Sequence, residues 1–95
     1  MILKEMCKTI YSLLLGYTIS LPYFVSVVCV SVIVEPFTTQ LPIEVLIQTP
    51  DEYTFIRAEK DITKFINDNL HDLIPAHLLI GGVLDIRVVR HTKEK

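Results

Sequence analysis

The sequence lacks the patterns by which most catalytic and metal centres are recognised. It has no Gly-x-Ser-x-Gly turn for a nucleophilic serine, and Gly81-Gly82 is not followed by the Lys and Ser or Thr of a phosphate loop. The histidines, His71, His77 and His91, do not match the spacing of a metal site. The sequence therefore predicts a protein that is not an enzyme, with no catalytic residue, no metal site and no cofactor.

Cysteine is also scarce, with two residues in a chain of 95. Cys7 precedes a long uncharged segment, Cys29 lies inside it, and the residues after Glu35 contain no cysteine. This distribution excludes a disulfide framework or a thiolate zinc site for the C-terminal part. We interpret both cysteines as small, buried hydrophobic residues.

Excess positive charge is missing as well. The formal net charge is −2, acidic and basic residues are interspersed, and no aromatic residues alternate with a basic stripe. Nucleic-acid-binding domains carry a basic footprint that neutralises phosphates. The charge pattern therefore predicts that nucleic acid is not a partner.

The most conspicuous absence is that of Asp, Glu, Lys, Arg and His from Thr9 to Val34. About 20 uncharged, mainly apolar residues are enough to cross a bilayer as a helix. The sequence thus predicts two parts: a membrane-spanning helix with a short basic flank in residues 1–34, and a small extramembrane α/β module in residues 35–95. Lys4 and Lys8 flank the span on its N-terminal side, so the positive-inside rule predicts a cytoplasmic or matrix N-terminus.

Small residues recur on one side of the predicted span. Ser12, Gly16 and Ser20 have four-residue spacing, which allows neighbouring helices to approach closely within a membrane. They are the candidate helix-packing residues, although small residues are also common in spans that pack against nothing. Pro22 follows them and is expected to kink the helix.

The same segment supports an alternative, a fully soluble cytoplasmic α+β domain. Its first residues have the spacing of an amphipathic helix, with Leu3, Met6, Cys7, Ile10, Leu13 and Leu14 on one face. Gly16 would then end the helix, and residues 23–34, rich in β-branched side chains, would form a buried strand. Ser26 and Ser31 fall on opposite faces of a regular strand. Such a strand would be buried on both sides and would need a partner subunit to cover it.

Residues 35–95 predict the order β-β-α-β. Residues 41–48 alternate between apolar and polar side chains, residues 49–52 have turn chemistry, and residues 53–57 read as a second short strand. Residues 59–74 have helical periodicity, and residues 83–91 alternate again. Together they predict an α+β fold in which one helix covers a small sheet.

Two functional hypotheses follow from these patterns. The first is a non-catalytic single-pass membrane protein, an accessory or assembly subunit that contacts lipid and either other membrane subunits or copies of itself. The second is a soluble homodimeric α+β binding module. Both assign the protein to protein–protein interaction, because a core of this size gives only marginal stability without a partner.

Overall fold

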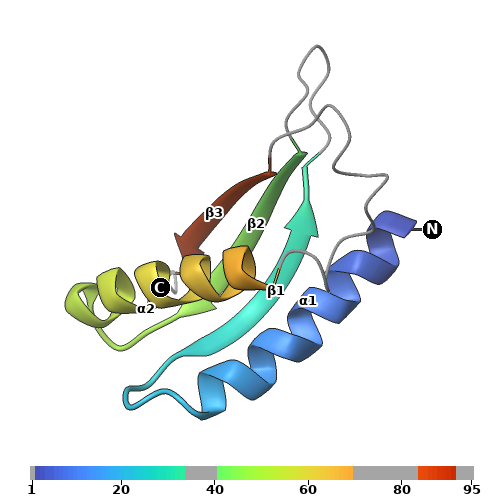
Figure 1. Cartoon of the computed structure of the whole chain (residues 1–95). Coiled ribbons are helices and arrows are strands. Elements are labelled where there is room, and N and C mark those ends of the chain that lie inside the picture. Colours follow the sequence, from blue (N-terminus) through green and yellow to red (C-terminus); the bar gives the residue numbers. More distant parts are fainter. Residues whose placement is uncertain (1, 34–40, 70–83, 92–95) are drawn as a thin grey trace.

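The computed structural model describes residues 2–33, 41–69 and 84–91. In these residues the chain forms helix α1 (Ile2–Ile19), strand β1 (Ser26–Val32), strand β2 (Leu41–Gln48), helix α2 (Glu52–Asp68) and strand β3 (Leu84–Arg90) (Figure 1). The fold is therefore α+β, with the order α-β-β-α-β.

The three strands form one sheet in the order β1-β2-β3. β1 runs antiparallel to β2, whereas β3 runs parallel to it, since α2 carries the chain back across the sheet between them. The central strand β2 was predicted with the bounds at which it is found. Its residues Ile43, Val45 and Ile47 are fully buried, which confirms the alternation read from the sequence.

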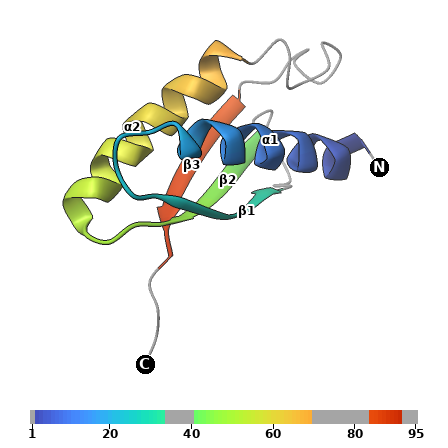
Figure 2. The same ribbon diagram turned by 90° about the horizontal axis from the view of Figure 1, so that it is seen from below.

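Both helices lie on the same side of the sheet (Figure 2). α1 contributes Met6, Ile10 and Leu14 to the shared core, and α2 contributes Ala58, Ile62 and Ile66. These side chains meet the inward residues of β2 together with Val27 and Val88. Residues from both sides of Glu35 therefore share a single core. The other side of the sheet, which we call the open face, is covered by neither helix.

The predicted transmembrane helix is wrong. No helix in the described residues is long and apolar enough to cross a membrane. α1 carries Lys4, Glu5 and Lys8, and it ends at Ile19 rather than continuing as a kinked helix past Pro22. The second half of the uncharged segment forms β1, in which Val27 packs into the core and the other side chains are exposed or half-buried. The predicted membrane location and the predicted cytoplasmic or matrix N-terminus were based on this helix, so both predictions are wrong as well.

The architecture agrees better with the alternative, but two of its details differ. Gly16 lies inside α1 and does not end it. Strand β1 is not buried on both sides: it lies at the edge of the sheet, and one of its sides belongs to the open face. The pairing register shifts between Val27 and Cys29. This β-bulge inserts one extra residue, so that Ser26 and Ser31 both fall on the open face, opposite Gln48 and Glu44.

The predicted strand at residues 53–57 is in fact the beginning of α2. Asp51 caps this helix: its Oδ1 atom accepts a 2.7 Å hydrogen bond from the backbone N–H of Thr54. The buried row of α2 is Thr54, Ala58, Ile62 and Ile66, at four-residue spacing. Its first two members are small, so the hydrophobic periodicity is visible only from Ile62 onward. The predicted helix residues 70–74 lie outside the described residues.

Candidate functional site: two strand edges and a groove beside α1

The residues predicted to pack against other helices lie on the outward side of α1. Ser12 and Gly16 are exposed within the helix, and Ser20 is exposed just after it. A Cβ atom added to Gly16 would meet no atom within 4 Å. These three residues therefore share a free surface among the parts of the chain that are described, and their contact with another helix stays a prediction.

The structure brings no metal-ligand cluster together in residues 2–33, 41–69 and 84–91. His71 and His77 lie outside these residues. His91 follows β3, and its backbone N–H donates a 2.6 Å hydrogen bond to the Ile47 carbonyl, which extends the parallel ladder. The prediction of no metal site and no catalytic residue remains a prediction.

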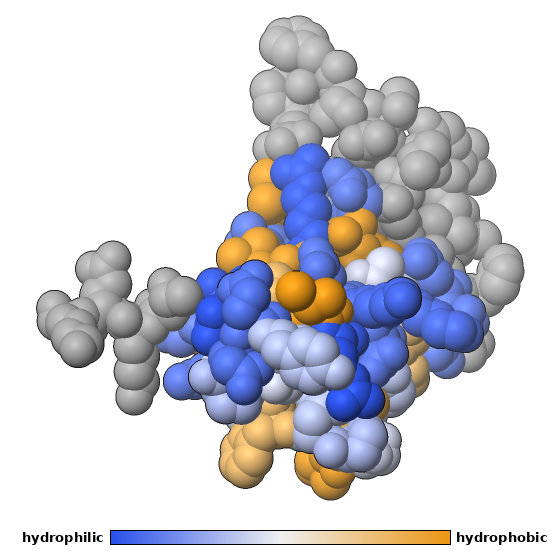
Figure 3. Space-filling model, turned by 90° about the vertical axis from the view of Figure 1, so that its left-hand side faces the viewer, coloured by the Kyte–Doolittle hydropathy of each residue, from blue (hydrophilic) through white to orange (hydrophobic). Residues whose placement is uncertain are grey.

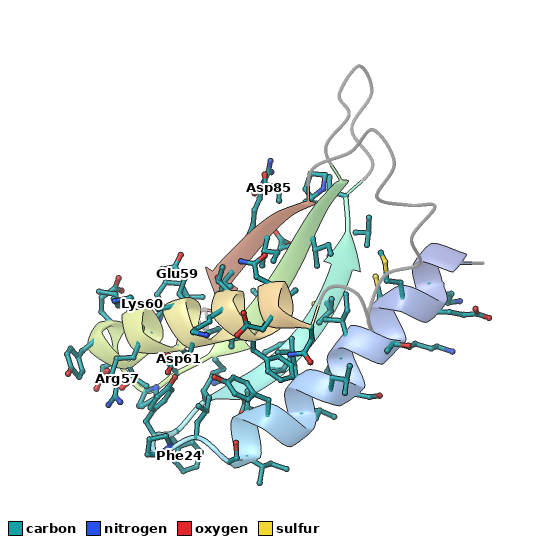
Figure 4. All side chains as sticks on the ribbon, viewed as in Figure 1. Phe24, Arg57, Glu59, Lys60, Asp61 and Asp85 are labelled. Atoms are coloured by element: carbon teal, nitrogen blue, oxygen red, sulfur yellow. The ribbon has the colours of Figure 1, made fainter. Side chains whose placement is uncertain are left out.

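A cluster of aromatic and charged side chains joins the turn after α1 to α2. The Tyr23 hydroxyl donates a 2.6 Å hydrogen bond to Oδ2 of Asp61, and the guanidinium carbon of Arg57 lies 4.7 Å from the centre of the Tyr23 ring. Figure 4 labels Arg57 and Asp61 on α2. Nearby, the Tyr17 and Phe65 rings stack with their centres 4.3 Å apart. Each of these side chains has a partner within the cluster, so we interpret it as a clamp between two elements rather than as a binding site.

A groove runs between the first half of α1 and the free side of β1. Its volume is about 330 Å³, and we call it the α1/β1 groove. It is lined by Lys4, Cys7, Lys8, Tyr11, Val28, Cys29 and Val30. Burial raises the pKa of the Cys7 thiol above its ordinary value of 9.0, more than a hydrogen bond with the Val32 backbone lowers it. The thiol is therefore neutral, and the groove combines an apolar floor with two cationic side chains.

A second hollow, of about 310 Å³, lies beside the turn between β2 and α2. It is lined by Phe24, Ser26, Gln48, Thr49 and Pro50. None of these side chains is charged, so the hollow offers shape but little electrostatic selectivity. It is a weaker candidate than the α1/β1 groove for binding a charged ligand.

The opposite edge of the sheet, β3, carries alternating charge. Asp85 and Arg87 are two residues apart and both fall on the open face, where they form an ion pair of 2.8 Å. Between them Ile86 faces the helices, opposite Ile43 of β2. Arg90, further along, pairs with Glu52 of α2 at 3.1 Å. From Asp85 to Val88 this edge carries opposite charges on the open face and apolar residues on the helix side.

Sequence reasoning assigned the charged groups of both edges to other roles. Lys4 and Lys8 were interpreted as the basic flank of a membrane span, whereas they line the α1/β1 groove. Asp85 and Arg87 lie in the segment 83–91, which was predicted to be an alternating strand, but nothing in the pattern of that segment indicates that the strand lies at an edge. The signal that could have indicated a pairing edge was the opposite charge of these two residues at two-residue spacing, which places both on one side of the strand.

Comparison of the chain with protein-family models, with curated proteins and with solved structures finds no match. The assignment of a function therefore depends on the geometry of the two strand edges.

Proposed function

We propose that the protein is a non-catalytic binding module that acts as a homodimer, in which β3 pairs antiparallel with β3 of a second copy. Among the described strands, β3 is hydrogen-bonded to β2 alone. An edge strand presents unpaired backbone groups to which another strand can add. Pairing of two such edges would extend the sheet to six strands.

The backbone groups available for this pairing follow from the ladder to β2. The N–H of His91 points to β2, because it donates to Ile47. Backbone groups alternate in direction along a strand. The N–H and carbonyl groups of Val89, Arg87 and Asp85 therefore also face β2, and those of Ile86 and Val88 face outward.

The observation that carries the proposal is the self-complementary charge pattern around Ile86. A two-fold axis at this residue places Ile86 opposite Ile86 of the second copy, in a hydrogen-bonded pair. The neighbouring non-hydrogen-bonded pairs then set Asp85 of each chain opposite Arg87 of the other, where side chains approach most closely. In a two-fold interface every such contact occurs twice.

The helix side of the same pairing is apolar. Leu84 of one chain would lie opposite Val88 of the other, flanking the central pair of isoleucines. Figure 3, which views the molecule from the left-hand side of Figure 1, shows hydrophobic residues among hydrophilic ones on the visible face. The alternation of apolar and charged pairs specifies the register, since a slip by one residue would set charges against apolar side chains.

The other edge is less suited to a symmetric contact. β1 contains the β-bulge at Val28, and bulges interrupt regular pairing along an edge. It also has α1 beside it, with which it forms the α1/β1 groove. These features favour β3 as the edge that pairs with a second copy.

Exchange of the two charges tests the proposal. Asp85→Arg and Arg87→Asp each set like charges opposite one another, whereas the double exchange Asp85→Arg/Arg87→Asp restores both pairs. We expect sedimentation equilibrium to show a dimer for the wild type and the double variant, and monomers for the single variants. Glu59→Arg and Lys60→Asp are matched controls, because they make the same charge changes on the exposed side of α2 (Figure 4).

Two results would contradict the proposal. One is a wild-type protein that remains monomeric at concentrations of about 100 μM, a range that detects even weak dimers. The other is a dimer that withstands both single charge reversals, because like charges facing each other across an interface cost several kcal/mol.

A further inference from the structure

From the α1/β1 groove we infer a ligand site for an extended peptide segment with a β-branched centre and acidic flanking residues. This inference specifies the ligand of the proposed binding module. It does not depend on the β3 dimer, because the groove lies at the opposite edge of the sheet.

The charge of the ligand follows from Lys4 and Lys8. They are one helical turn apart on α1, both exposed, and both line the groove. Neither forms an ion pair with any residue in the described part of the chain. Glu5, also on the first turns of α1, does not line the groove. Two ammonium groups on one rim select carboxylates on the ligand.

The extended conformation of the ligand follows from the backbone of β1. The N–H of Ile33 donates to the Pro42 carbonyl, so the groups of Ser31 face β2 and those of Val30 and Val32 face away from it. Val30 lies beyond the bulge and lines the groove, and its N–H and carbonyl are directed outward, where the backbone of one extended peptide residue can form hydrogen bonds with them.

The shape of the groove sets the centre of the ligand. Besides the two lysines, the groove is lined by Tyr11, Val28 and Val30 and by the thiols of Cys7 and Cys29. A volume of about 330 Å³ accommodates one or two side chains of moderate size. A β-branched residue fits because it favours the extended backbone that the edge of β1 requires.

A positional-scanning library of seven-residue peptides tests the site. We expect the wild-type protein to select Asp and Glu at the flanking positions and Val, Ile or Thr at the centre. The Lys4→Glu/Lys8→Glu variant should lose the acidic selection and bind the selected peptide about tenfold more weakly. Lys60→Glu/Lys64→Glu is the control, since it makes the same change in net charge on α2 and should bind as the wild type does.

Methylation of the peptide backbone separates strand addition from simple charge attraction. N-methyl groups can be placed on alternate amides of the selected peptide in two patterns, and both patterns keep its charges. Only one pattern blocks the amides that face β1, and we expect that form alone to lose binding. Equal binding of both N-methylated forms would overturn the inference, as would a library without acidic selection. The monomeric Asp85→Arg variant should still bind the peptide. Loss of the dimer in sedimentation and loss of peptide binding are therefore separate results, and each tests one proposal.

Discussion

The hydroxyl of Tyr23 donates a hydrogen bond to the Asp61 carboxylate across 38 residues of the chain. The bond fastens the turn between α1 and β1 to the middle of α2. A hydrogen bond to a charged acceptor contributes about 1.5–3 kcal/mol, and less where solvent reaches it. We therefore expect Tyr23→Phe to lower the free energy of unfolding by about 1 kcal/mol in urea titrations. Tyr53→Phe, on an exposed side chain, is the control and should change it little.

The same contact predicts a loss of stability at alkaline pH. Burial first, and then the hydrogen bond with Asp61, raise the pKa of Tyr23 above its ordinary value of 10.0. The unfolded chain therefore releases this proton at a lower pH than the folded protein does. The stabilisation is complete below pH 10 and declines as the pH rises further.

Thermal unfolding between about pH 9 and about pH 11 measures this effect. The wild type should lose stability more steeply than Tyr23→Phe over this range. The pKa of Tyr17 is also raised, by burial and by Asp61. The Tyr23→Phe variant should therefore still lose stability over this range, but less steeply. Identical slopes for the two proteins would show that Tyr23 does not contribute.

The core depends most on β2, which is covered on its inner side by both helices. Ile47 is fully buried there, so truncation leaves a cavity. We expect Ile47→Ala to lower the free energy of unfolding by about 2–5 kcal/mol. Ile56→Ala removes the same atoms from a side chain of α2 that is 55% exposed, and should change it by less than about 0.5 kcal/mol. Equal effects of the two substitutions would contradict the assignment of these residues to core and surface.

The beginning of α2 depends on Asp51. Its hydrogen bonds with Thr54 lower the pKa of this carboxyl below its ordinary value of 3.8. Its contribution is therefore present above pH 3.8 and is lost as the pH falls below that value. Asp51→Ala should lower the melting temperature near neutral pH and have a smaller effect at about pH 2. Asp51→Asn keeps an acceptor oxygen and should be closer to the wild type. An effect of Asp51→Ala that is equal at both pH values would contradict the capping role.

The sequence predicted those elements whose pattern is independent of distant residues. In β2, Ile43, Val45 and Ile47 lie on one side, and in β3 the apolar residues alternate with Asp85 and Arg87 as far as Val88, so both strands could be recognised locally. The charge-free segment misled because hydropathy does not distinguish lipid from protein as the cover of apolar side chains. The bulge at Val28 also hid the alternation of β1, which can be read only when its partner strand is known.

The candidate site was harder to predict than the fold. Ser12, Gly16 and Ser20 stood out because small residues at helical spacing have a known meaning in membranes. The edges were not visible, since an edge is defined by the order of strands in the sheet and not by the strand itself. Asp85 and Arg87 acquire their significance only because β3 lies outermost in the described sheet.

The pairing of β3 with its symmetry mate can be observed directly by nuclear Overhauser spectroscopy. In a dimer mixed from isotope-labelled and unlabelled chains, only contacts between different chains pass the filter. Directly opposed residues in non-hydrogen-bonded antiparallel pairs have Cα atoms about 4.5 Å apart, so their α-protons are close. The proposed register predicts an intermolecular signal between the α-protons of Asp85 and Arg87. Intermolecular signals from β1 or the outward side of α1, with none from β3, would contradict it.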